Sequence, residues 1–228
     1  MEPSELLALR TGTVEGWKYT HSVVPLGSLA VPSGRLEASD PFVNLGEAFV
    51  LPIPPGTYPA FVTLADVSEE QDGSHIRETY LSLVIADGEV ARVEFANPEL
   101  ADPDEAPGSE EDFYGVPVDA GTVGFADAEA VQRCMPEGNW YEDLFDNDTD
   151  GSWFNLMDSP DHLRAGSANI PFPLATGGES VVLTHSGWGD GVYPVLTAFD
   201  ADGKLLSVHI DLFVNEEDGD EPEEAEPS

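Results

Sequence analysis

The chain is poor in basic residues, and this shortage narrows the range of its partners. Its 228 residues contain only 8 Lys and Arg against 45 Asp and Glu, so the formal net charge at pH 7 is -37. A charge of this size repels phosphate groups and anionic lipid headgroups at long range. We therefore expect neither a nucleic acid nor a membrane surface as a partner.

Cysteines and long apolar runs are also scarce. Cys134 is the only cysteine, which excludes an internal disulfide and is typical of proteins in a reducing compartment. No apolar run approaches the roughly 18 residues that a membrane-spanning helix needs. Met1 is followed by Glu2 and Glu5 rather than by a basic segment and an apolar segment, so we expect no signal peptide. Together these absences predict a cytoplasmic protein.

The excess of acidic residues has two explanations. It can be a general adaptation that keeps a protein soluble in a salt-rich cytoplasm, where ions screen the self-repulsion. It can instead serve a basic partner protein, which the negative field steers to the surface and which carboxylates then hold. The acidic residues occur all along the chain, and this even distribution favours the first explanation.

Two acidic runs divide the chain. Residues 99–112 carry seven acids together with prolines and a glycine, which is typical of a linker or a long loop. Residues 215–228 carry eight acids and no large apolar side chain, so we predict a disordered tail. We expect the remaining chain to form an N-terminal β-rich part over 1–98 and a C-terminal β-rich part with a helix over 113–214.

Alternating apolar residues between turn signals predict antiparallel β-structure in both parts. An Asp-Gly dipeptide between two such runs is typical of a two-residue hairpin turn. Two hairpins are predicted in this way: Asp87-Gly88 between Thr79–Ile85 and Val90–Phe95, and Asp202-Gly203 between Tyr193–Phe199 and Leu205–Val214. We therefore expect a mainly β fold with sandwich-like antiparallel sheets and one or two short helices.

One helix is predicted directly after Asp127. The side chain of this residue can cap the helix N-terminus, and apolar residues follow at helical spacing as far as Met135. Glu129 and Arg133 lie four positions apart, a spacing at which opposite charges pair on a helix surface. Pro136 ends the helix because it cannot continue the backbone hydrogen bonds.

Two long motifs stand out in the C-terminal part. Residues 115–130 read Gly-Val-Pro-Val-Asp-Ala-Gly-Thr-Val-Gly-Phe-Ala-Asp-Ala-Glu-Ala, and residues 186–194 read Ser-Gly-Trp-Gly-Asp-Gly-Val-Tyr-Pro. Both resemble hallmarks of a bacterial family known as domain of unknown function 4241. Shorter segments match that family in the same order: Gly34–Leu36, Asp40-Pro41, Pro54–Pro59, and Asp200–Gly203 with the apolar strand that ends near Asp211.

The resemblance extends from about Gly34 to Val214, with two departures. Val116-Pro117 interrupts the usual approach to Asp119, and Val123 stands where the family has a glycine. The family has no established activity, so the resemblance implies no chemistry. Its association with bacterial toxin–immunity loci implies an inhibitory binding role.

One segment has the spacing of a calcium loop. Residues 146–151 read Asp-Asn-Asp-Thr-Asp-Gly, in which Asp146, Asp148 and Asp150 can converge on one hard cation. The twelfth position is Met157 rather than the usual glutamate. An acidic loop in contact with solvent explains the same residues. Calcium is thus the one cofactor that the sequence suggests, and a calcium-stabilised structural module is one functional hypothesis.

Three aspartates in or beside the family-like motifs are candidates for chemistry. Asp119, Asp190 and Asp211 can form a metal site or an acid/base site if the fold brings them together. A metal-dependent enzyme is therefore a second hypothesis, and it requires the three side chains to lie within roughly one metal-ligand sphere. The alternative is that each carboxylate forms local hydrogen bonds in a turn or at a helix end.

A polar strand face offers another arrangement. Ser207, His209 and Asp211 alternate with apolar residues, so they share one face of the last predicted strand. His209 and Asp211 can then be oriented together as a base and its partner, or as metal ligands. A polar face in contact with solvent is the simpler interpretation.

The third hypothesis, which we favour, is protein binding. Trp188 lies between two glycines in a predicted loop, and an exposed aromatic residue among carboxylates is typical of a binding hot spot for a basic partner. The predicted contact residues are Trp188, Asp190, Tyr193 and Asp119. Because no complete catalytic constellation is present, we expect an acidic interaction module rather than an enzyme. An immunity-type inhibitor that binds a basic toxin or enzyme surface fits this description.

Overall fold

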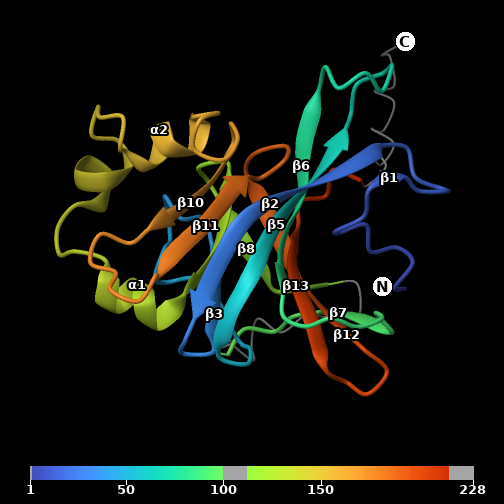
Figure 1. Cartoon of the computed structure of the whole chain (residues 1–228), viewed down its shortest axis with the longest axis horizontal. Coiled ribbons are helices and arrows are strands. Elements are labelled where there is room, and N and C mark those ends of the chain that lie inside the picture. Colours follow the sequence, from blue (N-terminus) through green and yellow to red (C-terminus); the bar gives the residue numbers. More distant parts are fainter. Residues whose placement is uncertain (1, 100–111, 216–228) are drawn as a thin grey trace, which may run out of the picture.

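Residues 2–99 and 112–215 are described by a computed structural model. Within them the protein is mainly β, with two antiparallel sheets packed face to face and three short helices (Figure 1). The predicted linker, apart from its two end residues, and the predicted tail from residue 216 onward lie outside the described residues.

The larger sheet has eight strands and curls into a half-barrel (Figure 1). In spatial order they are β1 (Gly12–Thr13), β2 (Thr20–Val31), β5 (Gly56–Asp66), β6 (Ile76–Val84), β13 (Leu205–Asp211), β12 (Gly191–Phe199) and β7 (Arg92–Phe95). The eighth strand, β8 (Gly115–Val118), pairs with the first half of β12. Strand β6 from before the acidic run thus pairs with β13 from after it.

The smaller sheet has five strands. Their spatial order is β10 (Ser167–Pro171), β11 (Ser180–His185), β9 (Thr122–Asp127), β3 (Arg35–Ser39) and β4 (Phe49–Pro52). Its outer face is covered by α1 (Ala128–Cys134), a π-helical turn η2 (Tyr141–Phe145) and α2 (Trp153–Asp158) (Figure 1). In the part of the chain that the structure describes, no helix is long and apolar enough to span a membrane.

The main core lies between the two sheets, because successive side chains of a strand point to opposite faces. Phe125 of β9, Leu81 of β6 and Ile210 of β13 are fully buried members of this core. A second apolar cluster lies between the smaller sheet and the helices and includes Val131 and Trp153. Both faces of the smaller sheet are therefore buried.

A third apolar cluster covers the outer face of the larger sheet. The N-terminal segment places Leu6, Leu7 and Ala8 there, against Tyr80 of β6 and Leu196 of β12. All five side chains are buried. This segment therefore closes a sheet face that would otherwise meet solvent.

The two Asp-Gly dipeptides have different outcomes. Asp202-Gly203 joins β12 to β13, which pair with each other, so this hairpin prediction is confirmed. The hairpin predicted at Asp87-Gly88 is wrong, because β6 pairs with β13 while β7 pairs with β12. The β12–β13 hairpin lies between β6 and β7, so β6 and β7 form their backbone hydrogen bonds with this hairpin rather than with each other. Gly88 instead permits close packing, since a Cβ atom there would lie 2.7 Å from Leu206 Cδ2.

The helix predicted after Asp127 is present as α1. Asp127 Oδ1 accepts a hydrogen bond from the backbone N–H of Ala130 at 2.8 Å, as expected for a cap. The predicted pair between Glu129 and Arg133 is wrong. Arg133 Nη2 instead donates to Glu179 Oε1 at 2.8 Å, and this acceptor is held in place just before β11.

Candidate functional site

The three carboxylates of the predicted metal-dependent enzyme lie in different settings. Asp119 is exposed in the turn between β8 and β9, and Asp190 is exposed just before β12. Asp211 is buried at the end of β13, where Oδ1 accepts a hydrogen bond from the backbone N–H of Phe213 at 3.0 Å. Within residues 2–99 and 112–215, no three His, Cys, Asp or Glu side chains are grouped so that they could hold a metal ion.

The predicted calcium loop is an exposed turn between η2 and α2. Asp146, Asp148 and Asp150 are all exposed. The turn is organised by Asn147, whose Oδ1 accepts hydrogen bonds from the backbone N–H and the Oγ1 of Thr149 at 3.2 and 2.6 Å. The three carboxylates take no part in these contacts, and calcium binding stays a prediction.

The carboxylate of Asp40, which was not among the site residues predicted from the sequence, contacts the first of the two long family-like motifs. Asp40 is completely buried, and its Oδ2 accepts hydrogen bonds from the backbone N–H groups of Asp119 and Ala120 at 3.0 and 2.7 Å. Its Oδ1 accepts from Thr122 Oγ1 at 2.6 Å and from the backbone N–H of Phe42 at 3.3 Å. We call this arrangement the Asp40 cradle. It joins the segment after β3 to the turn that precedes β9.

The second long motif packs against this cradle. The loop Ser186–Asp190, which we call the Trp188 loop, begins with the Ser186 backbone N–H donating to the Gly121 carbonyl at 3.0 Å. Both Ser186 Oγ and Tyr193 Oη donate to the Gly189 carbonyl, at 2.6 and 2.8 Å. A loop held by three such hydrogen bonds has few alternative conformations. The two motifs that resemble the family therefore form one structural junction.

The side chain of Trp188 projects from this loop and is 54% exposed. The guanidinium of Arg77 lies 5.1 Å from its ring centroid, and the His75 ring meets it edge-on at 6.3 Å. Gly187 and Gly189 on either side have positive φ angles of 69° and 110°, which a residue with a side chain adopts at a cost. The loop geometry thus depends on both glycines, and it holds the tryptophan at the surface.

Tyr193, the remaining residue of the predicted contact set, is buried. Its hydroxyl supports the Trp188 loop from below, and burial raises its pKa. Of the four predicted contact residues, Trp188, Asp190 and Asp119 are exposed while Tyr193 positions the loop that carries two of them. The turn with Asp119 adjoins the same loop, since Gly121 packs beside Gly189.

A family model described as "Protein of unknown function (DUF4241)" matches residues 29–210. The chain belongs to this family. The matched residues include the Asp40 cradle and the Trp188 loop. No curated protein and no solved structure matches the chain.

In this member of the family, the polar face of β13 is buried, so the prediction that it contacts solvent is wrong. His209 is only 1% exposed and lies between two hydroxyls, with Nε2 2.8 Å from Ser207 Oγ and Nδ1 2.8 Å from Ser82 Oγ. Burial lowers its pKa to about 3, so the ring is neutral near pH 7. Both ring nitrogens contact serines rather than Asp211, and a neutral ring without a carboxylate partner is a weak general base.

Sequence reasoning missed the importance of Asp40 because its partners are distant in the chain. The signal was present, since Asp40-Pro41 is one of the short segments that match the DUF4241 family. Pro41 in turn packs on Gly124, where a Cβ atom would lie 2.5 Å from the proline ring. An Asp-Pro dipeptide and a distant glycine-rich turn can thus be the two sides of one contact. Only the fold shows that these two segments meet.

Proposed function

We propose that this protein is an acidic binding module that captures a basic partner protein through the Trp188 loop, in the manner of an immunity-type inhibitor. The observation that carries the proposal is the half-exposed Trp188 on a loop held by three hydrogen bonds. Tryptophan is one of the three residue types in which the hot spots of protein–protein interfaces are enriched. Asp190 on this loop and Asp119 in the adjoining turn supply exposed carboxylates.

Rigidity of the loop supports a role in binding. An interface residue that is already fixed loses little conformational freedom when the complex forms. The ring of Trp188 is held from one side by Arg77, while the loop backbone is tied to Gly121 and supported by Tyr193. The aromatic anchor therefore needs little reorganisation before it contacts a partner.

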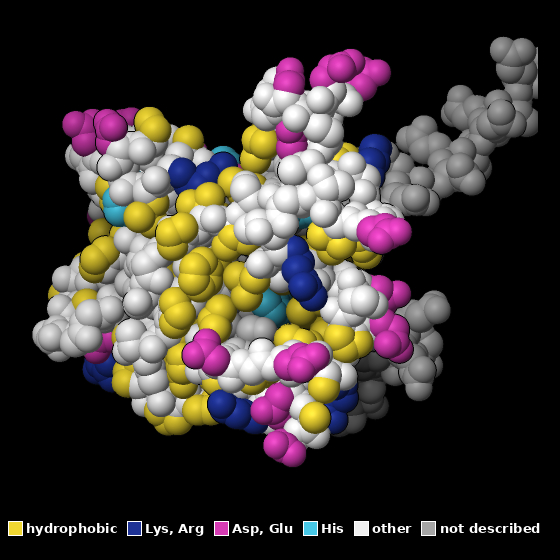
Figure 2. Space-filling view, turned by 45° about the vertical axis from the view of Figure 1, so that its right-hand side comes forward, with side chains coloured by type: hydrophobic (Ala, Val, Ile, Leu, Met, Phe, Trp, Pro, Cys, Tyr) yellow, Lys and Arg dark blue, Asp and Glu magenta, His cyan; other side chains and the backbone are white. Residues whose placement is uncertain are grey.

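The net charge supports a basic partner. A charge of -37 attracts cationic proteins from a distance and raises their association rate. On the face shown in Figure 2, the acidic side chains lie in several separate groups, with uncharged, hydrophobic and a few basic side chains between them. Acidic groups spread in this way steer a partner without specifying its position, so we assign specificity to the Trp188 loop.

The test is a titration with a purified basic protein recovered by co-purification at low salt from cells that express the tagged chain. Binding is measured for the wild type and for Trp188→Ala and Asp190→Asn. Two variants serve as matched controls: Tyr141→Ala removes another half-exposed aromatic residue, and Glu15→Gln removes an exposed carboxylate far from the loop in the sequence.

We expect a one-to-one complex whose dissociation constant rises with salt. Trp188→Ala weakens binding on the order of 30-fold, the equivalent of about 2 kcal/mol. Asp190→Asn mainly slows association, and the two control variants bind like the wild type. The proposal fails if the recovered partner is not basic, or if Trp188→Ala binds as tightly as Tyr141→Ala.

A further inference from the structure

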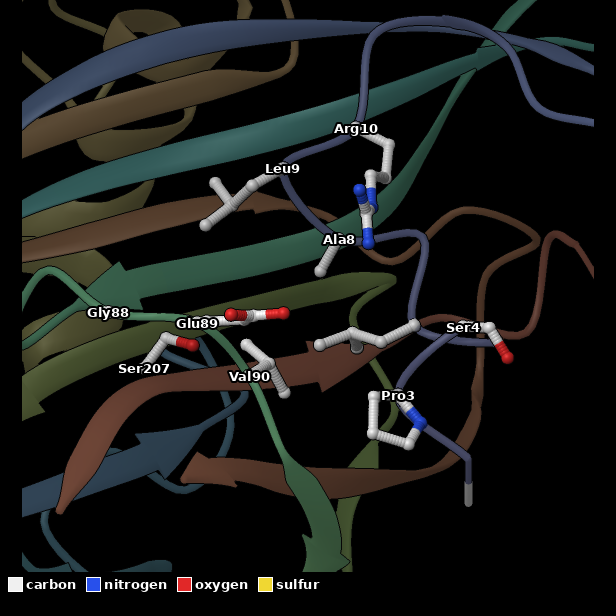
Figure 3. A pocket seen from close by; sticks show the side chains of 10 residues that line it. Pro3, Ser4, Ala8, Leu9, Arg10, Gly88, Glu89, Val90 and Ser207 are labelled. Carbon is white, nitrogen blue, oxygen red and sulfur yellow. The ribbon is translucent and has the colours of Figure 1, made fainter. Parts of the chain in front are cut away.

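A cavity of about 500 Å³ lies on the outer face of the larger sheet, between the N-terminal segment and the crossover from β6 to β7 (Figure 3). Its volume is in the range of small-molecule sites, roughly 300–1,000 Å³. The walls combine apolar, charged and hydroxyl-bearing side chains, among them Leu6, Val90, Arg10, Glu89 and Ser207. It is separate from the residues of the Trp188 loop.

Both walls of the cavity are fastened to the sheet beneath. On one side Leu7 is buried in the third apolar cluster, and the Leu9 backbone N–H donates to Thr63 Oγ1 at 2.9 Å. On the other side the Ala86 backbone N–H donates to the Leu206 carbonyl at 3.0 Å. The cavity is therefore a built feature of the fold rather than a gap beside a loose loop.

Two opposite charges point into this space. Figure 3 shows the guanidinium of Arg10 reaching in from the N-terminal segment and the carboxylate of Glu89 reaching in from the crossover. Among the residues that the structure describes, neither side chain belongs to an ion pair within 4.0 Å. Arg10 is one of only 8 Lys and Arg residues in a chain with 45 acids, yet it forms no ion pair with any carboxylate of residues 2–99 and 112–215.

The hydroxyl of Ser207 adds a fixed polar group to the wall. Its Oγ lies 2.8 Å from His209 Nε2, and the other ring nitrogen of His209 contacts Ser82 Oγ. Because the imidazole is fully buried between two strands, its orientation is fixed, and the hydrogen bond orients Ser207. The serine thus offers one oriented hydrogen-bonding group to a ligand beside Arg10 and Glu89.

We propose that the cavity binds a free α-amino acid with an aliphatic side chain. Arg10 pairs with the α-carboxylate, Glu89 pairs with the α-ammonium group, and Leu6 and Val90 contact the aliphatic side chain. A guanidinium binds a carboxylate through two parallel hydrogen bonds, which makes it the natural partner for that group. A ligand with only one of the two charges leaves either Arg10 or Glu89 without a partner.

The test uses three probes in isothermal titration of the whole chain. L-Leucine carries both charges, 4-methylpentanoate lacks the ammonium group, and 3-methylbutylamine lacks the carboxylate. We expect L-leucine to bind with a dissociation constant of about 1 mM or below. The two single-charge probes bind at least about tenfold more weakly, because each loses one charge-assisted hydrogen-bonded contact.

Two variants make the assignment specific. In Arg10→Gln, L-leucine loses its advantage over 3-methylbutylamine, and in Glu89→Gln it loses its advantage over 4-methylpentanoate. Glu15→Gln, which removes an equal charge outside the cavity, binds L-leucine like the wild type. The proposal is overturned if L-leucine does not bind at about 10 mM, if the three probes bind equally, or if both variants keep the wild-type affinity. None of these measurements depends on Trp188. A negative result for L-leucine therefore does not contradict the proposed partner binding, and failure of the partner binding does not contradict this site.

Discussion

Thr122 Oγ1 donates a hydrogen bond of 2.6 Å to Asp40 Oδ1, although the two residues are 82 positions apart in the chain. Asp40 also accepts from the backbone N–H groups of Asp119 and Ala120. Each hydrogen bond to a buried carboxylate offsets part of the cost of removing it from water, so the loss of a donor destabilises the fold. The cradle therefore couples the segment after β3 to the turn that supports the Trp188 loop.

Asp40→Asn should be among the more damaging single substitutions in the protein. The amide places an –NH₂ group where Asp40 Oδ2 now accepts two backbone N–H groups, or where Oδ1 accepts two further donors. We expect the free energy of unfolding in urea to fall by about 3 kcal/mol. Thr122→Val, which removes one donor and keeps the shape, should cost about 1 kcal/mol. A value for Asp40→Asn within 0.5 kcal/mol of the wild type, a margin of about the spread for surface substitutions, would contradict the role of the cradle.

Local sequence signals located the strands but could not choose their partners. Asp87-Gly88 and Asp202-Gly203 have the same turn chemistry and the same flanking alternation, yet only the second closes a hairpin. The difference lies in competition for sheet edges, because the β12–β13 hairpin pairs with β6 on one side and with β7 on the other. No signal within Thr79–Phe95 reports that a segment more than a hundred residues later will be inserted there.

The same limit applies to the polar face of β13. The alternation correctly placed Ser207 and His209 on one strand face, and Ser82 is the direct cross-strand neighbour of His209 in β6. Contact with solvent was the wrong inference, because Leu6 and Ala8 from the N-terminal segment cover this side of the sheet. Trp188 was located more successfully, since two flanking glycines are a local signal for an irregular loop.

Glu179 should make the protein less stable as the pH falls. Hydrogen bonds from its own backbone N–H and from that of Gly177 lower the pKa of its carboxyl group to about 2, and Arg133 contributes in the same direction. The unfolded chain takes up this proton near pH 4.5, so the stabilisation is complete above that pH and is lost as the pH falls toward 2. Urea unfolding of the wild type and of Glu179→Gln from pH 7 to pH 3 checks this. The difference in stability between the two should shrink on acidification, and a constant difference would contradict the assignment.

Glu37, unlike Glu179, should make the protein less stable as the pH rises. Burial raises the pKa of its carboxyl group, although the backbone N–H of Gly46 donates to it at 2.7 Å. The folded state therefore holds this proton more tightly than the unfolded chain, and the ionised group costs stability above the folded pKa. Glu37→Gln keeps an acceptor for Gly46 and removes the charge, so we expect it to stabilise the protein at pH 7. Its advantage should vanish as the pH falls to about 4.5, and a variant less stable than the wild type at pH 7 would contradict this account.

The ion pair between Glu78 and Arg164 links the two sheets. Substitutions of these two residues should have strongly non-additive effects on the free energy of unfolding. Arg164 Nη1 lies 2.5 Å from Glu78 Oε1 of β6 and also donates to Ser167 Oγ of β10 at 3.0 Å. Arg164→Met leaves the buried Glu78 without its cation and should cost about 3 kcal/mol in urea unfolding.

The double variant Glu78→Leu with Arg164→Met removes both charges, so it should be more stable than Arg164→Met alone. Glu94→Gln is the matched control, because it breaks the pair with Arg92, in which both side chains are about half exposed, and should change stability by less than about 0.5 kcal/mol. If the effects of the two substitutions at Glu78 and Arg164 simply add, the carboxylate is not destabilised by losing its partner. The link between the sheets would then rest on apolar packing and on other contacts, such as the hydrogen bond from Asn169 Nδ2 of β10 to the Leu26 carbonyl of β2 at 2.9 Å.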